Sequence, residues 1–106
     1  MVAFIEDEVA FEGLLASETF LVVDCTATWC GPCKVVAPLM DQLADEYGDR
    51  AKVFKLDLDD NKALAKRLSI KSIPAVMFFK EGELVETIIG VKPYSIFSAA
   101  LETLMA

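Results

Sequence analysis

Histidine is absent from this chain of 106 residues. Its absence excludes every site in which histidine activates a catalytic cysteine, and every metal site that uses histidine ligands. Any group that transfers a proton in this protein must therefore be a carboxylate, a lysine, a thiol or water.

Basic side chains are also scarce, because 10 lysines and arginines face 17 aspartates and glutamates and leave a net charge of −7. This charge repels polyanions, so we expect no nucleic-acid partner and no binding to anionic membranes. No apolar run approaches the ~20 residues of a membrane-spanning helix. Residues 1–8 soon become acidic and do not show the pattern of a signal peptide. We therefore expect a cytoplasmic protein, or a protein of an organelle stroma or matrix whose transit peptide has been removed.

Cysteine is limited to three residues, Cys25, Cys30 and Cys33, which cannot all pair with one another. This number disfavours a secreted domain that is held together by disulfides. The apolar fraction of 55% is high enough to build a core without such crosslinks. The length fits one domain that spans residues 1–106.

Hydrophobic periodicity divides the chain into alternating strands and helices. Helices are expected at about 8–15, at 30–47, from a cap at 59, 60 or 61 to about 68, and from 93 onward. Strands are expected at 20–25, 52–58, 75–80 and 84–89. Pro38 falls inside the second helix, where its ring predicts a kink, and Gly48 fits the end of that helix. One of Asp59, Asp60 and Asn61 is expected to cap the third helix.

The order of these elements predicts an α/β fold. A strand, a helix and a second strand imply a parallel pair, and the later hairpin, turned at residues 81–83, adds antiparallel strands. The expected result is a mixed central sheet of four to five strands with about four helices on its two faces. In the last helix, five apolar residues are expected to face inward: Ile96, Phe97, Ala100, Leu101 and Leu104.

The segment Trp29–Cys33 reads WCGPC and carries two cysteines separated by two residues. If a helix begins at Cys30, Cys33 lies one turn further on, with Cα atoms roughly 5 Å apart, inside the ~4.4–6.8 Å that a disulfide requires. The first turn of a helix stabilises a thiolate, and Pro32 fixes the backbone there. The pair is therefore predicted to open and close one disulfide and to attack another. Half of a zinc site is the alternative, but zinc usually takes four ligands and only Cys25 remains, so we expect no metal.

Asp24 interrupts the apolar run of residues 20–25. On a strand that is covered on both faces its carboxyl would be desolvated, which raises its pKa; a solvated strand end is the alternative. The neighbouring Cys25 is expected to behave as a small buried apolar side chain. The other interpretation of Cys25 is a regulatory thiol that can be glutathionylated or paired.

Together with the residues around it, the WCGPC segment shows that the chain resembles the thioredoxin family over essentially its whole length. The matching residues are Asp24, Ala27–Lys34, Pro38, Lys55–Asp57, Ile73–Pro74, Lys80–Glu83 and Gly90. A C-x-x-C pair alone is a weak signal, whereas WCGPC in this order is specific. Two departures leave partner choice and redox tuning open. Cys25 and Thr26 replace the usual aromatic or small residues, and Ser72 replaces a common glycine.

The resemblance implies a chemical role for four residues. Cys30 would be the nucleophile that attacks a client disulfide, and Cys33 the thiol that resolves the mixed disulfide. Asp24 would accept the proton of Cys33, directly or through water. Lys55 would modulate the charge of Asp24, with a plain solvated lysine as the alternative.

The resemblance also implies a set of residues that bind the client. Pro74 would be a cis-proline that faces the dithiol and leaves the Ile73 backbone free to pair with an extended client segment. A proline at a strand entrance is the alternative. Four residues would form an apolar rim around Cys30: Trp29, Ile73, Gly90 and Val91. Gly31 and Pro32 favour the reducing end of the superfamily.

The implied function is that of a protein-disulfide reductase, which needs no bound cofactor because electrons enter by thiol exchange. Its partners would be a thioredoxin reductase, NADPH- or ferredoxin-linked, and oxidised client proteins such as peroxiredoxins, with the chain acting as a monomer. Three alternatives stay open: a disulfide oxidase or isomerase with the same motif, a binding module that does not depend on its sulfurs, and a metal- or cluster-binding variant that uses Cys30.

Overall fold

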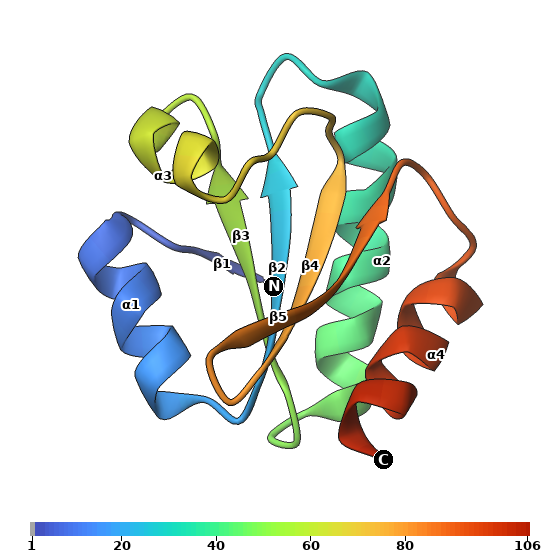
Figure 1. Cartoon of the computed structure of the whole chain (residues 1–106). Helices are drawn as coiled ribbons and strands as arrows, with labels where there is room; N and C mark the ends of the chain where they lie inside the picture. The colour runs from blue at the N-terminus through green and yellow to red at the C-terminus, as the bar shows by residue number, and fades with distance from the viewer. Residues whose placement is uncertain (1) are drawn as a thin grey trace.

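The computed structural model describes residues 2–106. In it, five strands form one mixed sheet, and four helices pack on the two faces of this sheet (Figure 1). The helices are α1 (Glu8–Ser17), α2 (Gly31–Tyr47), α3 (Lys62–Arg67) and α4 (Tyr94–Met105). The strands are β1 (Ala3–Phe4), β2 (Phe20–Thr26), β3 (Lys52–Asp57), β4 (Ala75–Lys80) and β5 (Glu83–Ile89). Helices α1 and α3 cover one face of the sheet, and α2 and α4 cover the other. The predicted α/β class is confirmed.

The strand order across the sheet is β1-β3-β2-β4-β5. Strands β1, β3 and β2 run parallel to one another, whereas β4 and β5 are antiparallel to their neighbours. The predicted parallel pair and the predicted hairpin are therefore confirmed. Strand β1 was not expected, because its two residues are too few to show a periodicity.

Strand β2 lies in the middle of the sheet and is buried from Leu21 to Cys25. Its side chains alternate between two cores, because successive residues of a strand point to opposite faces. Val22 packs in the core under α2 and α4, whereas Leu21, Val23 and Cys25 pack in the core under α1 and α3. Asp24 therefore points toward α2.

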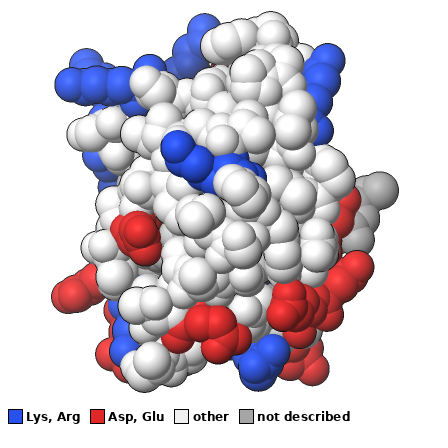
Figure 2. All heavy atoms as spheres, turned by 90° about the vertical axis from the view of Figure 1, so that its right-hand side faces the viewer, with Lys and Arg blue, Asp and Glu red and all other residues white. Residues whose placement is uncertain are grey.

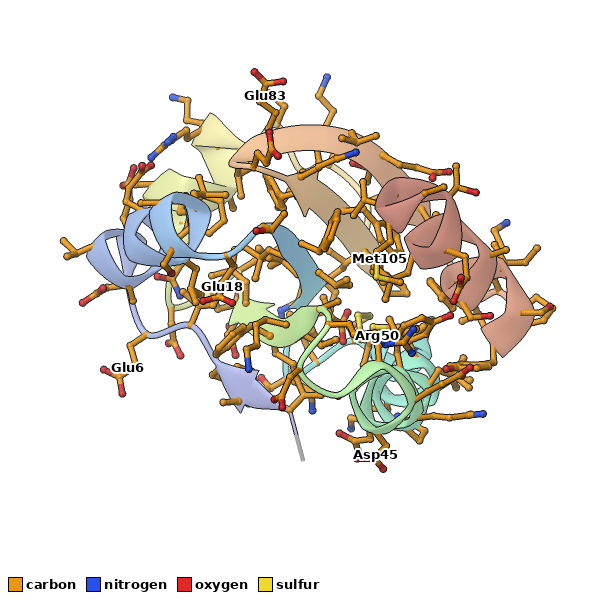
Figure 3. All side chains as sticks on the ribbon, turned by 90° about the horizontal axis from the view of Figure 1, so that it is seen from below. Glu6, Glu18, Asp45, Arg50, Glu83 and Met105 are labelled. Carbon is orange, nitrogen blue, oxygen red and sulfur yellow. A yellow bond between two sulfur atoms is a disulfide. The ribbon has the colours of Figure 1, made fainter. Side chains whose placement is uncertain are left out.

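Apolar side chains fill the space between the sheet and both helical layers, as the view from below shows (Figure 3). In the core under α1, the rings of Phe11 and Phe79 meet edge to face with centroids 5.7 Å apart. The labelled carboxylates of Glu6, Asp45 and Glu83 point outward. A charged group inside this sheet is therefore an exception that needs a specific reason.

The helix ends follow local sequence signals in most cases. Asp7 caps α1 by accepting a hydrogen bond of 2.8 Å from the Ala10 N–H. Gly48 ends α2 with a φ of 53°, a left-handed conformation that suits glycine. Helix α2 continues through Pro38, so the kink predicted there does not divide the helix. Asn61 precedes α3 without a side-chain capping bond.

One prediction for the last helix is wrong. Phe97, Leu101 and Leu104 of α4 are buried, but Ile96 is 45% exposed. One residue turns a helix by about 100°, so Ile96 leaves the stripe that faces the sheet. Within the part of the chain that the structure describes, no helix is long and apolar enough to cross a membrane.

Candidate redox site

The dithiol lies where β2 is followed by α2. The Cys30 N–H donates to the Ala27 carbonyl at 3.2 Å, which closes a turn, and α2 begins at Gly31. Cys30 is the N-cap of α2, and its sulfur accepts the Cys33 N–H at 3.2 Å. Pro32 occupies the first turn, where its missing N–H breaks no helix hydrogen bond. This stretch of sequence therefore places both sulfurs at the positive end of a helix.

Cys30 and Cys33 form a disulfide with their Cα atoms 5.3 Å apart. The predicted separation of one helical turn is thus confirmed. In this oxidised state both sulfurs are buried, because Cys30 is only 4% exposed, close to the 2% of Cys33. Ala27 and Ile73 pack against the two cysteines and shield them.

The Ile73–Pro74 peptide bond is cis, as the resemblance implied. The Pro74 carbonyl accepts the Gly90 N–H at 2.8 Å, and Gly90 has a φ of 93°, which suits glycine. Among residues 2–106, no hydrogen bond outside the helices and strands involves the Ile73 backbone. The β2–α2, α3–β4 and β5–α4 connections all lie at the upper end of the sheet in Figure 1. Ile73, Pro74 and Gly90 therefore share one end of the molecule with the dithiol.

Apolar surface is exposed at the same end of the sheet. Trp29 is 70% exposed and Val91 is 46% exposed. The indole N–H of Trp29 donates to the Asp59 carboxylate at 2.8 Å, which orients the ring. Sequence reasoning missed this contact and treated Asp59 only as a candidate helix cap. A signal existed, because Trp29 follows β2, Asp59 follows β3, and these parallel strands end at the same edge of the sheet.

Asp24 is 1% exposed, and neither of its carboxyl oxygens has a hydrogen-bond partner among the described residues. Burial raises its pKa from 3.8 to about 7, while the Lys55 ammonium acts in the opposite direction. The two residues are directly paired across β2 and β3. Asp24 is therefore a buried acid and not a solvated strand end, and Lys55 lies beside it.

A cavity of about 170 Å³ adjoins the buried acid. Its lining includes Asp24, Cys33, Lys55, Thr26 and Phe4. A water molecule needs only about 10–15 Å³ of such space, together with polar partners. The carboxyl of Asp24, the hydroxyl of Thr26 and the ammonium of Lys55 supply these partners. The cavity thus adjoins both the acid and Cys33 and has room for water between them.

Cys25 is a free thiol with no exposed surface. Burial, and after it the charge of Asp24, raises its pKa to about 12. Its side chain packs with Leu21 and Val23 on the face opposite to Asp24. From residue 2 to residue 106, no three Cys, Asp or Glu side chains gather as a metal site would require.

Two sulfurs at the start of a helix can bond or separate without any change in the fold around them. Such a pair stores and releases two electrons by exchange with other thiols. The fold and the site together therefore define a dithiol–disulfide oxidoreductase.

Comparison with known proteins gives the family. A family model described as thioredoxin matches residues 2–103. Thioredoxin 1 of Synechococcus elongatus is 38% identical over 100 residues, which are 94% of each protein. The chloroplastic M-type thioredoxin of Spinacia oleracea is 46% identical over 91 residues, which are 86% of this chain and 50% of that protein, so the chain spans about half the length of this relative.

A solved structure agrees with the sequence comparisons. The thioredoxin of Malassezia sympodialis superposes with a TM-score of 0.90 at 32% identity, over 99% of this chain and 94% of that chain. The chain belongs to the thioredoxin family.

Proposed function

We propose that this chain is a protein-disulfide reductase that passes two electrons from its dithiol to disulfides in client proteins. The observation that carries the proposal is the Cys30–Cys33 disulfide at the start of α2. Membership of the thioredoxin family supports it, because thioredoxins are disulfide oxidoreductases.

The reduced dithiol would act in two exchange steps. The Cys30 thiolate attacks one sulfur of a client disulfide, forms a mixed disulfide and releases the other client sulfur, which takes up a proton. The Cys33 thiolate then attacks the Cys30 sulfur, re-forms the internal disulfide and releases the second client thiol. The client gains two electrons and two protons, and the chain loses the same number. Cys30 is the natural first nucleophile because it caps α2, where the helix end favours a thiolate.

Asp24 would take the proton that Cys33 loses in the second step. Its carboxyl lines the same cavity as Cys33. A pKa of about 7 lets Asp24 exist in both protonation states near neutral pH, as a proton acceptor should. Lys55 would favour the ionised acceptor, since its ammonium lowers that pKa.

Client proteins would dock at the end of the sheet that carries the dithiol. Trp29 and Val91 expose apolar surface there, and the unpaired Ile73 backbone could pair with an extended client segment. Figure 2 shows the side of the molecule formed by α2 and α4, where acidic side chains gather toward the lower end and neutral and basic ones occupy the upper end. On this side, a client that approaches the dithiol end would meet little negative charge.

Electrons would come from a thioredoxin reductase, and the clients would include oxidised peroxiredoxins. We propose that the chain acts as a monomer in the cytoplasm, or in the stroma or matrix of an organelle. The chloroplastic M-type thioredoxin among the relatives supports an organelle setting.

Reduction of insulin disulfides, with dithiothreitol as the electron source, tests the proposal. We expect rapid turnover by the wild type and none by Cys30→Ser. The matched control is Cys25→Ala, which removes a buried thiol from the core under α1 and α3 and should keep turnover. A wild type without turnover would contradict the reductase assignment, and a redox titration would then examine the oxidase or isomerase alternative.

A further inference from the structure

Phe4 lies on the edge strand β1, and 53% of its surface is exposed. It has no part in the client surface described above. One contact nevertheless links Phe4 to the buried acid Asp24 through Lys55, since the Lys55 Nζ atom lies 5.5 Å from the centroid of the Phe4 ring. The function of this aromatic residue therefore has to be sought through Lys55.

Three directly paired residues form a row across β1, β3 and β2. Phe4 pairs with Lys55, and Lys55 pairs with Asp24. Neighbouring strands lie ~4.8 Å apart and paired residues point to the same face, so the three side chains are neighbours on the face that α2 covers. All three line the cavity that also contains Cys33.

Lys55 thus stands between Phe4 and Asp24 in the row of paired residues, and its ammonium contacts the Phe4 ring. A cation within about 6 Å of a ring centroid is attracted to the face of the ring. The flexible stem of lysine would otherwise let the ammonium turn toward water, where its attraction to Asp24 is screened. The ring of Phe4 opposes that movement.

We infer that Phe4 is a positioning residue, whose ring holds the Lys55 ammonium beside the Asp24 carboxyl at the mouth of the cavity. Phe4 does not touch the reacting sulfurs and acts only through Lys55. The proton transfer that it serves, from Cys33 to Asp24, rests on the proposed function.

Among residues 2–106, no other charged group around Asp24 takes the place of Lys55. Asp57 on β3 and Lys34 on α2 also line the cavity, but Lys55 is the charge that lowers the pKa of Asp24. On the other side of Asp24, β4 contributes the apolar Val76. The position of the Lys55 ammonium should therefore decide how strongly the carboxyl is stabilised as an anion.

Titration of the Asp24 carboxyl carbon by NMR, in the oxidised protein, tests the inference without any need for catalysis. Phe4→Leu keeps an apolar side chain and removes the ring, so the pKa of Asp24 should rise. An exposed cation–π contact changes the ratio between the held and the released position of the Lys55 ammonium by about two- to fivefold. The acid dissociation constant of Asp24 should therefore fall by about that factor in Phe4→Leu. Lys55→Met sets the upper limit of this change. Phe4→Tyr keeps the ring and should titrate like the wild type.

A double variant separates positioning from general structural effects. In Phe4→Leu/Lys55→Met, the Phe4 substitution should add nothing, because the ammonium on which it acts is gone. The matched control is Phe20→Leu, since the Lys80 Nζ atom lies 5.9 Å from the Phe20 ring centroid in a similar pair that is not part of the cavity. It should leave the titration of Asp24 unchanged.

The inference is overturned if Phe4→Leu or Lys55→Met leaves the pKa of Asp24 at the wild-type value, or if the Phe4→Leu effect persists without Lys55. A chain that titrates as expected but does not reduce insulin would contradict the proposed function alone. The two failures are therefore distinguishable.

Discussion

Replacement of Asp24 by asparagine should stabilise the fold, and the gain should depend strongly on pH. The carboxyl of Asp24 is 1% exposed and finds no hydrogen-bond partner in the described part of the chain, so its ionisation in the folded protein is costly. Asparagine has nearly the same shape and cannot ionise. Asp24→Asn therefore removes the buried charge and little else.

The magnitude follows from the difference between the Asp24 pKa in the unfolded and folded states. Folding raises this pKa from 3.8 to about 7, with burial as the main cause and Lys55 opposing it. Each pKa unit corresponds to about 1.36 kcal/mol, so ionised Asp24 should lower the free energy of unfolding by about 4 kcal/mol.

The sign of the pH dependence is fixed by which state releases the proton first. Below pH 3.8 both states keep it, and the variant and wild type should be similarly stable. As the pH rises from 3.8 to about 7, the unfolded wild type releases the proton while the folded form retains it, so the wild type loses stability. Above this window the full difference between the two proteins is present.

Urea unfolding of the two oxidised proteins, from about pH 3.5 to about pH 8.5, measures the difference in unfolding free energy. Asp45→Asn is the matched control, because Asp45 is exposed and its replacement should stay within ~0.5 kcal/mol of the wild type at each pH. A gain from Asp24→Asn that does not change with pH, or a variant less stable than the wild type above neutral pH, would refute the reasoning.

Three further outcomes are expected. Cys33→Ser should trap clients on Cys30, because the resolving thiol is gone; a non-reducing gel should show an insulin adduct that dithiothreitol removes, and no adduct would argue against this role. Alkylation of the reduced native protein should spare Cys25, which is fully buried with a pKa raised to about 12; labelling before denaturant is added, detected by mass spectrometry, would show that the thiol is accessible. Asp59→Ala should lower the fluorescence anisotropy of Trp29, the single tryptophan, because the hydrogen bond that orients its ring is lost; unchanged anisotropy would mean that other contacts hold the ring.

Most of the fold could be predicted because its elements are long enough to display a period. The apolar run at residues 20–25 and the hairpin turned at 81–83 are typical of a central strand and an antiparallel pair. Strand β1 offers only two residues, so its place beside β3 depends on the rest of the sheet. The error at Ile96 has a related cause, since an apolar side chain near the right spacing cannot reveal how narrow the stripe facing the sheet is.

The site divides into features that helix geometry determines and features that packing determines. The Cα separation of Cys30 and Cys33 follows from one turn of helix. The burial of Cys30 does not, because Ile73 comes from a loop far along the chain. The bond from Trp29 to Asp59 likewise depends on where two loops lie in space, and no local pattern in the sequence reports that.

The alternation of residues along β2 places Asp24 and Cys25 on opposite sides of the sheet. The third thiol is therefore enclosed in the core under α1 and α3, whereas the dithiol lies at the end of the sheet. Because Cys25 has no exposed surface, its reaction with an external oxidant requires the molecule to open. An oxidant that meets a folded molecule reaches only Cys30 and Cys33, whose disulfide belongs to the working cycle. An oxidant that meets an opened molecule can also modify Cys25 and prevent correct refolding. Oxidation of Cys30 and Cys33 is therefore compatible with the folded state, whereas oxidation of Cys25 follows only after unfolding.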